Sequence, residues 1–161
     1  RRRRRDMTGI VVIAHAPLAS ALGKCVEHVY SCEPGVAQRE VRLLDVEADE
    51  AFEATLARAR ALVSEVDAGN GVLVLADAFG ATPGNVATRL AEPGRVAVVA
   101  GVNLPMLLRA VCYRAGPLAD LVAKAITGGE QGIVQSGSST AVQNQAKKRA
   151  GDDQQRIQDQ Q

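Results

Sequence analysis

The stretch GIVVIAHAP, residues 9–17, decides the fold of this chain. Its apolar run Ile10–Ala14 is mostly β-branched, which is typical of a buried parallel strand. Pro17 suits the first turn of a helix, because its missing N–H would lack a partner there anyway. His15 is therefore expected at the carboxyl end of a strand, where open α/β sheets bind their ligands. The alternative for any lone histidine is a packed or solvent-facing side chain without a chemical role, so the residues around it must decide.

Four apolar runs of this kind predict the strands of one sheet, at Ile10–Ala14, Val41–Val46, Gly71–Ala76 and Val96–Ala100. Helix-like segments follow each run. They comprise Leu18–Val29, Ala48–Val66, a helix that starts at Pro83 with Thr82 as its cap, and one from Pro105 toward Ile126 that breaks near Gly116-Pro117 and ends at Gly128-Gly129. This alternation predicts an α/β fold with a doubly wound, mostly parallel four-stranded sheet in the order 2-1-3-4 and helices on both faces. A short strand at the edge of the sheet is also predicted at Gly132–Gln135.

The composition fits one domain with a real core. The chain has 161 residues, of which 47% are apolar, and a formal charge of +1. That balance gives no drive toward nucleic acid, and no run approaches the ~18 apolar residues of a membrane helix. The cysteines are three in number and lack CxxC spacing. This argues against a disulfide framework and a zinc site, so we expect a cytoplasmic protein.

Both ends of the chain differ from its middle. Residues 1–6 begin with five arginines and are expected to be a disordered basic extension, with Met7 as the natural start. A secretory signal is rejected, because His15 and Pro17 interrupt the apolar stretch too early. We expect the domain to span residues 7–135. From residue 136 the composition changes to Gly, Ser, Gln, Asn, Lys and Asp, so residues 136–161 are expected to form a disordered polar tail.

A second group of residues falls beside His15. The third strand ends at Asp77, and in the predicted order its end is next to the end of the first. A carboxylate bonded to one imidazole nitrogen fixes the tautomer and frees the other nitrogen as a nucleophile or base. The turn through Gly80, Ala81 and Thr82 can present N–H groups to an anion at a helix N-terminus. Spacing alone leaves a phosphoryl-transfer site and an unspecified ligand pocket equally open, because each residue could also serve only a turn or cap.

Three segments of the chain resemble those of the mannose-family enzyme IIA of the bacterial sugar phosphotransferase system. They are GIVVIAHAPLASAL (residues 9–22), GVLVLADAFGATPGNVA (71–87) and VAGVNLPMLLRA (99–110). The resemblance implies that His15 accepts a phosphoryl group from the phosphocarrier HPr and passes it to a IIB partner, without metal or cofactor. It also implies that Asp77 and Thr82 serve the site. It further implies a homodimer built through the C-terminal strand.

The chain departs from this family at two points. Ala78 stands where transport members have a hydroxyl residue, and a polar tail stands in place of a linker, so we expect no IIB domain after it. A regulatory module that senses HPr or another partner, with little phosphate flux, therefore remains an alternative, as does the related domain that feeds dihydroxyacetone kinase. A metal-dependent hydrolase is a poor fit, because the predicted edge holds one histidine and one carboxylate.

The remaining polar and sulfur residues receive plainer interpretations. His28 lies inside a predicted helix and is expected at a surface or helix end. Asn103 either lines the site or serves the turn before Pro105. Phe79 is a candidate for a partner-docking surface. Core positions are expected for Cys25 and Cys112, and a core or rim position for Met106.

Overall fold

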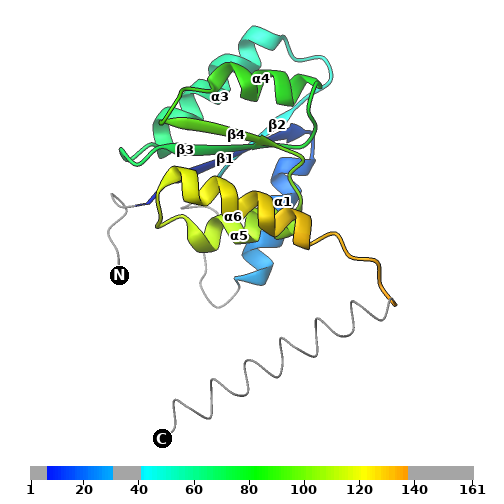
Figure 1. The fold of residues 1–161 in the computed structure, drawn as a ribbon. Helices are drawn as coiled ribbons and strands as arrows, with labels where there is room; N and C mark the ends of the chain where they lie inside the picture. Colours follow the sequence, from blue (N-terminus) through cyan, green and yellow to red (C-terminus); the bar gives the residue numbers. More distant parts are fainter. Residues whose placement is uncertain (1–6, 31–40, 138–161) are drawn as a thin grey trace, which may run out of the picture.

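The computed structural model describes residues 7–30 and 41–137 of the chain. Its sheet contains β1 (Gly9–His15), β2 (Val41–Val46), β3 (Val72–Ala76) and β4 (Val96–Ala100). All neighbouring strands are parallel, and their order is β2-β1-β3-β4 (Figure 1). The predicted strands and their order are confirmed. β1 thus has a strand on each side, and the ends of β2 and β3 flank its own end.

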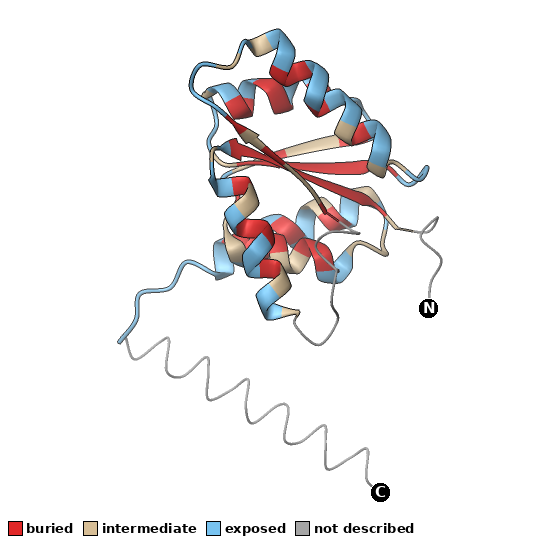
Figure 2. Cartoon of the chain, turned by 180° about the vertical axis from the view of Figure 1, so that it is seen from behind, coloured by how far each residue is buried: buried red, intermediate tan, exposed pale blue. Residues whose placement is uncertain are grey.

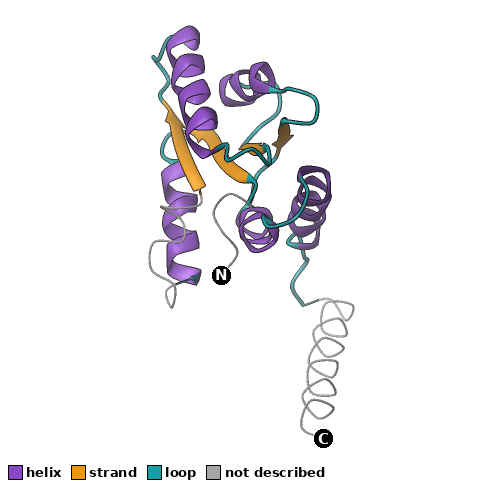
Figure 3. Ribbon diagram, turned by 90° about the vertical axis from the view of Figure 1, so that its left-hand side faces the viewer, coloured by secondary structure: helices purple, strands orange, loops and turns teal. Residues whose placement is uncertain are grey.

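Helices cover both faces of this sheet (Figures 1 and 3). One layer contains α3 (Phe52–Val66) and α4 (Thr82–Leu90), and the other contains α1 (Leu18–Val29), α5 (Leu104–Tyr113) and α6 (Leu118–Gln131). The predicted break between the last two helices is confirmed, because residues 114–117 form a turn that ends in Pro117.

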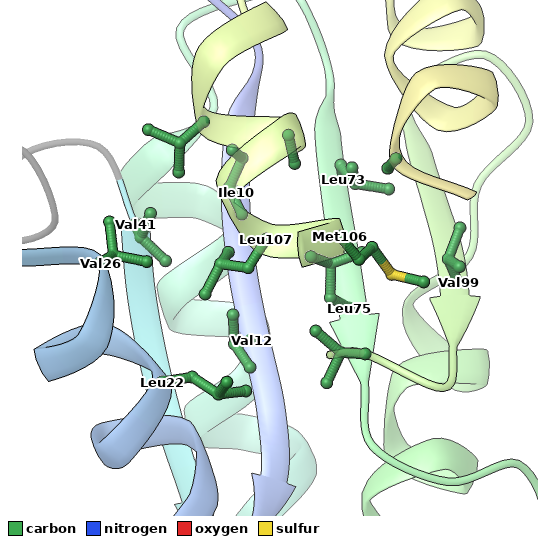
Figure 4. Packing of buried hydrophobic residues seen from close by; sticks show 14 of the residues in the cluster. Ile10, Val12, Leu22, Val26, Val41, Leu73, Leu75, Val99, Met106 and Leu107 are labelled. Carbon is green, nitrogen blue, oxygen red and sulfur yellow. The ribbon is translucent and has the colours of Figure 1, made fainter. Parts of the chain in front are cut away.

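The side chains of β1 supply both cores, because successive residues of a strand point to opposite faces. Ile10 and Val12 pack with α1, α5 and α6, whereas Val11 and Ile13 pack with α3 and α4. All four are fully buried, and Figure 2 shows the strands as the most buried layer. In Figure 4 Leu107 of α5 lies over β1, beside residues of α1 and β3. A central strand buried on both faces explains the continuous apolar run in the sequence.

Three predicted helix boundaries need correction. The helix after β2 starts at Phe52 instead of Ala48, because a turn closed by a hydrogen bond from the Glu50 N–H to the Glu47 carbonyl precedes it. Thr82 is the first residue of α4, and Ala81 holds the cap position without a side-chain bond. The last helix does not end at Gly128-Gly129. A Cβ on Gly128 would lie 2.7 Å from the Cβ of Arg109, so these glycines allow α6 to pack closely on α5.

The predicted edge strand at Gly132–Gln135 is not formed. After α6 the chain leads away from the sheet (Figure 1), and the side chains of Ile133 and Val134 are exposed. A strand needs hydrogen bonds to a neighbouring edge, and residues 132–135 pair with none of the four described strands. The basic extension at 1–6 and the tail beyond residue 137 lie outside the described residues, so what is expected of them stays a prediction; Cys32 also lies outside the described residues.

The two cysteines that the structure describes are exposed, so their predicted burial is wrong. Cys25 precedes the buried Val26 in α1, and Cys112 follows the buried Val111 in α5. Each helix therefore turns the neighbouring valine toward the core and the cysteine toward solvent. Met106, expected in the core or at its rim, is buried. None of the described helices is both long enough and apolar enough to cross a membrane.

Candidate functional site

His15 is the last residue of β1, and its side chain is 57% exposed while the rest of the strand is buried. Its backbone N–H donates to Oδ2 of Asp77 at 2.9 Å, and its ring nitrogen Nδ1 lies 2.6 Å from the same oxygen. One carboxylate oxygen thus holds both the main chain and the ring. The predicted contact between the ends of the first and third strands is confirmed.

Asp77 reaches this position because β3 ends beside Ile13, two residues before the end of β1. Ile13 pairs with Ala76, so Asp77 follows β3 at the level of the end of β1. Its second oxygen, Oδ1, accepts the N–H of Ala78 at 2.8 Å. Partial burial raises the pKa of Asp77, but the hydrogen bonds from His15 and Ala78 outweigh it and hold that pKa below its ordinary value. Asp77 is therefore an ionised hydrogen-bond acceptor at neutral pH.

The pairing of His15 with Asp77 leaves one ring nitrogen available. A carboxylate that accepts from Nδ1–H keeps the proton on that nitrogen. Among residues 7–30 and 41–137, no hydrogen bond engages Nε2 of His15. Its lone pair is therefore directed away from Asp77 on an exposed ring. This is the arrangement required of a nucleophile or a general base.

The loop after Asp77 leads directly into α4. Gly80 has a φ of +81°, a backbone conformation that residues with a side chain rarely adopt. This conformation turns the chain toward the helix. Within the described part of the chain, the N–H groups of Phe79, Gly80, Ala81 and Thr82 have no hydrogen-bond partner. The uncapped start of α4 thus offers unpaired donors and a positive helix end, which together favour an anion.

Gly84 is a residue of this site that the sequence analysis missed. A Cβ on Gly84 would lie 2.2 Å from the carbonyl oxygen of Ala78, so the first turn of α4 packs directly on the loop. Only glycine permits this approach. The glycine that follows Pro83 at a predicted helix start indicates such a close contact. Glycine destabilises a helix, so its presence there usually has a packing reason.

The other singled-out residues have separate roles. Phe79 is 88% exposed, which agrees with a docking surface. Asn103 caps α5 by accepting the N–H of Met106, and it donates to the carbonyl of Gly129, so its turn role is confirmed. His28 is exposed on the last turn of α1, at the helix end that points away from His15. In the described parts of the chain, no three His, Cys, Asp or Glu side chains form a group that could hold a metal ion.

Comparison with known proteins identifies relatives. The family model EIIA-man, described as the fructose IIA component of the phosphotransferase system, matches residues 9–127. The mannose-specific EIIAB component of Escherichia coli K12 is 31% identical over 127 residues, which are 77% of this chain and 38% of that protein. The chain thus spans well under half the length of the curated relatives it matches.

Solved structures share the fold. The EIIA component of Streptococcus agalactiae has a TM-score of 0.69 at 27% identity, over 80% of this chain and 97% of that one. The mannose/sorbose-specific IIA subunit of Enterococcus faecalis has a TM-score of 0.69 at 25% identity, over 80% of this chain and 94% of that one.

The lowered pKa of Asp77 predicts an acid-dependent share of stability. A carboxyl whose pKa is lower in the folded state contributes stability that is fully present above its unfolded pKa of about 3.9 and is lost as the pH falls through the folded value. We expect Asp77→Asn to unfold at lower urea concentration than the parent near pH 7, and the difference to shrink below about pH 4. Asp49→Asn, a change at an exposed carboxylate after β2, serves as the control. A difference that grows as the pH falls would contradict the assignment.

Proposed function

The chain belongs to the EIIA-man family of phosphotransferase-system IIA components, and we propose that it is a phosphocarrier whose His15 carries the phosphoryl group. The observation that supports this most directly is the 2.6 Å contact between Nδ1 of His15 and Asp77 on an exposed ring. It leaves Nε2 as the nitrogen that takes the group. No observation favours the alternative of a regulatory module with little phosphate flux.

The transfer step needs no further reactant. The lone pair of Nε2 attacks the phosphorus of a donor phosphohistidine, and the new N–P bond forms as the donor's N–P bond breaks. The donor ring leaves with that electron pair. Positive charge develops on the His15 ring, and the Asp77 carboxylate stabilises it through the Nδ1–H bond. Return of the group to an acceptor follows the same path in reverse.

The turn through Gly80, Ala81 and Thr82 receives the transferred group in this proposal. Its N–H groups stabilise the charge on the equatorial oxygens, which is the main contribution that a protein makes to phosphoryl transfer. Ala78 supplies no hydroxyl, but its N–H binds Asp77 at 2.8 Å. This turn, which we call the phosphate cradle, therefore depends on the main-chain N–H groups of Gly80, Ala81 and Thr82 and on the hydroxyl of Thr82.

The partners follow from the family. HPr is the proposed donor and a IIB component the proposed acceptor, in sugar uptake within the cytoplasm. The exposed ring of Phe79 next to Ala78 gives either partner an apolar anchor close to the reacting nitrogen. The curated relatives are named as mannose-specific, and the sugar served by this chain is left open.

A homodimer is part of the same proposal. Its support is the family resemblance together with Ile133 and Val134, whose side chains are 79% and 59% exposed after α6. Two adjacent exposed β-branched residues are suited to pairing with the free edge of a second copy's sheet.

The first test of the function is phosphorylation. With phosphoenolpyruvate, enzyme I and HPr, we expect one acid-labile, alkali-stable phosphoryl group per chain, located on His15 by mass spectrometry. His15→Ala should take no label. His28→Ala is the matched control and should be labelled like the parent, because His28 lies at the far end of α1. Undiminished labelling of His15→Ala would refute the mechanism.

A second prediction concerns the carboxylate. Asp77→Asn should slow phosphoryl transfer from phospho-HPr at least about tenfold, because a neutral amide stabilises the imidazolium less and can favour the wrong tautomer. Thr82→Ala should slow it less, since the N–H groups of the turn remain. Stopped-flow or quenched-flow rates measure both. Unchanged kinetics in Asp77→Asn would assign the carboxylate a structural role only.

A third prediction separates the C-terminal segments. A chain that ends at Gln135 should fold, accept phosphate and form the same dimer as the full chain. A chain that ends at Gln131 should lose the dimer, because Ile133 and Val134 are removed. Light scattering and thermal melting compare the two. A monomeric full-length chain would disprove the proposed dimer.

A further inference from the structure

Two helix N-termini lie on the same edge of the sheet as His15. Only Ala16 and Pro17 separate His15 from α1, and only the loop of residues 78–81 separates Asp77 from α4. The start of any helix carries about half a positive charge. Either start could therefore attract a phosphoryl group on His15, but the structure equips the two differently.

A carboxylate from another strand fills the start of α1. Pro17 makes no side-chain cap, and instead Asp45 of β2 accepts two bonds from Ser20 in the first helical turn. The Ser20 N–H donates to Oδ1 at 3.1 Å, and the Ser20 hydroxyl donates to Oδ2 in a short contact. Asp45 thus does from a neighbouring strand what a capping residue does from within the chain.

The start of α4 has no such group. Ala81 offers no side chain that could cap it, and the first turn contains no acidic residue. The starts of α1 and α4 therefore carry net charges of opposite sign. The carboxylate of Asp45 changes the start of α1 from about +0.5 to about −0.5, whereas the start of α4 keeps about +0.5.

The strand that carries Asp45, β2, also fixes the chain just after His15. The N–H of His15 donates to Asp77 after β3, and the next N–H, from Ala16, donates to the carbonyl of Val46 at 3.1 Å. Val46 directly follows Asp45. The end of β2 therefore holds both the chain just after His15 and the helix that begins there.

We propose that Asp45 is a positioning residue for phosphoryl transfer, which occupies the start of α1 with negative charge and so directs the phosphoryl group of His15 to the uncapped start of α4. This inference rests on the proposed phosphorylation of His15. Asp45 touches neither the ring nor the proposed phosphate cradle in any recorded contact, and acts through Ser20 and through its charge.

The test is the response of backbone amides to phosphorylation, followed by ¹H–¹⁵N NMR of the full chain before and after treatment with phosphoenolpyruvate, enzyme I and HPr. In the parent, the amides of Gly80, Ala81 and Thr82 should move downfield and those of Leu18, Ala19 and Ser20 should move much less. If His15 takes no phosphate, the proposed function fails. If it is phosphorylated and both sets of amides move equally, only the role of Asp45 is overturned.

Two variants separate charge from capping. Asp45→Asn keeps an acceptor for the Ser20 N–H but removes the charge, so the α1 amides should now respond and transfer should slow about two- to fivefold. Ser20→Ala loses the hydroxyl bond and keeps the charge, so its α1 amides should stay as unresponsive as in the parent.

Asp49→Asn removes an exposed charge from the loop after β2 and should behave like the parent. An α1 response in Ser20→Ala as large as in Asp45→Asn would show that capping, not charge, directs the phosphoryl group, and would overturn the proposal. If Asp45→Asn does not fold, the parent and Ser20→Ala spectra still decide whether charge or capping directs the group. An α1 response in Ser20→Ala that exceeds the parent's would show capping, and an unchanged response would show charge.

Discussion

The contact between His15 and Asp77 joins the ends of two adjacent strands, and the rest of the site is built around it. One oxygen of Asp77 binds both the ring and the backbone N–H of His15. The other oxygen binds the N–H of Ala78 and so sets the first residue of the loop toward α4. A single carboxylate therefore orients the nucleophile and begins the anion-binding turn. Its hydrogen bonds also explain why it stays ionised despite partial burial.

The strand order gives this contact its surroundings. Since β1 lies between β2 and β3, its end receives side chains and carbonyls from both. Asp77 comes from one side, and Asp45 and Val46 come from the other. Successive N–H groups, of His15 and Ala16, are bonded to opposite neighbours. An exposed histidine is in this way fixed by hydrogen bonds to both neighbouring strands, and transfer between proteins requires that combination of access and fixed geometry.

The sequence predicted the parts of the structure that depend on local pattern. Largely apolar runs rich in β-branched residues predicted the four strands, and their alternation with helices predicted the order that brings His15 and Asp77 together. Features that depend on packing between distant segments were not predictable. The glycine after Pro83 indicates a close contact but not that Ala78 makes it, and no local pattern reveals that Asp45 binds a serine 25 positions earlier in the chain. The predicted burial of Cys25 and Cys112 was wrong for a related reason, since residue type alone does not tell which face of a helix is buried.

The absence of a hydroxyl at Ala78 is consistent with a site that depends on main-chain donors. Backbone N–H groups fixed by the positive φ of Gly80 and by the close approach of Gly84 need no side-chain rotamer to be ordered before they bind an anion. A hydroxyl would add one more donor, whereas the geometry of the turn decides whether any donor is aligned. The shape of this loop therefore depends first on Gly80, on Gly84 in the first turn of α4 and on the carboxylate of Asp77. Ala78 is exposed and contributes its N–H to this shape, so the turn forms without a hydroxyl at position 78.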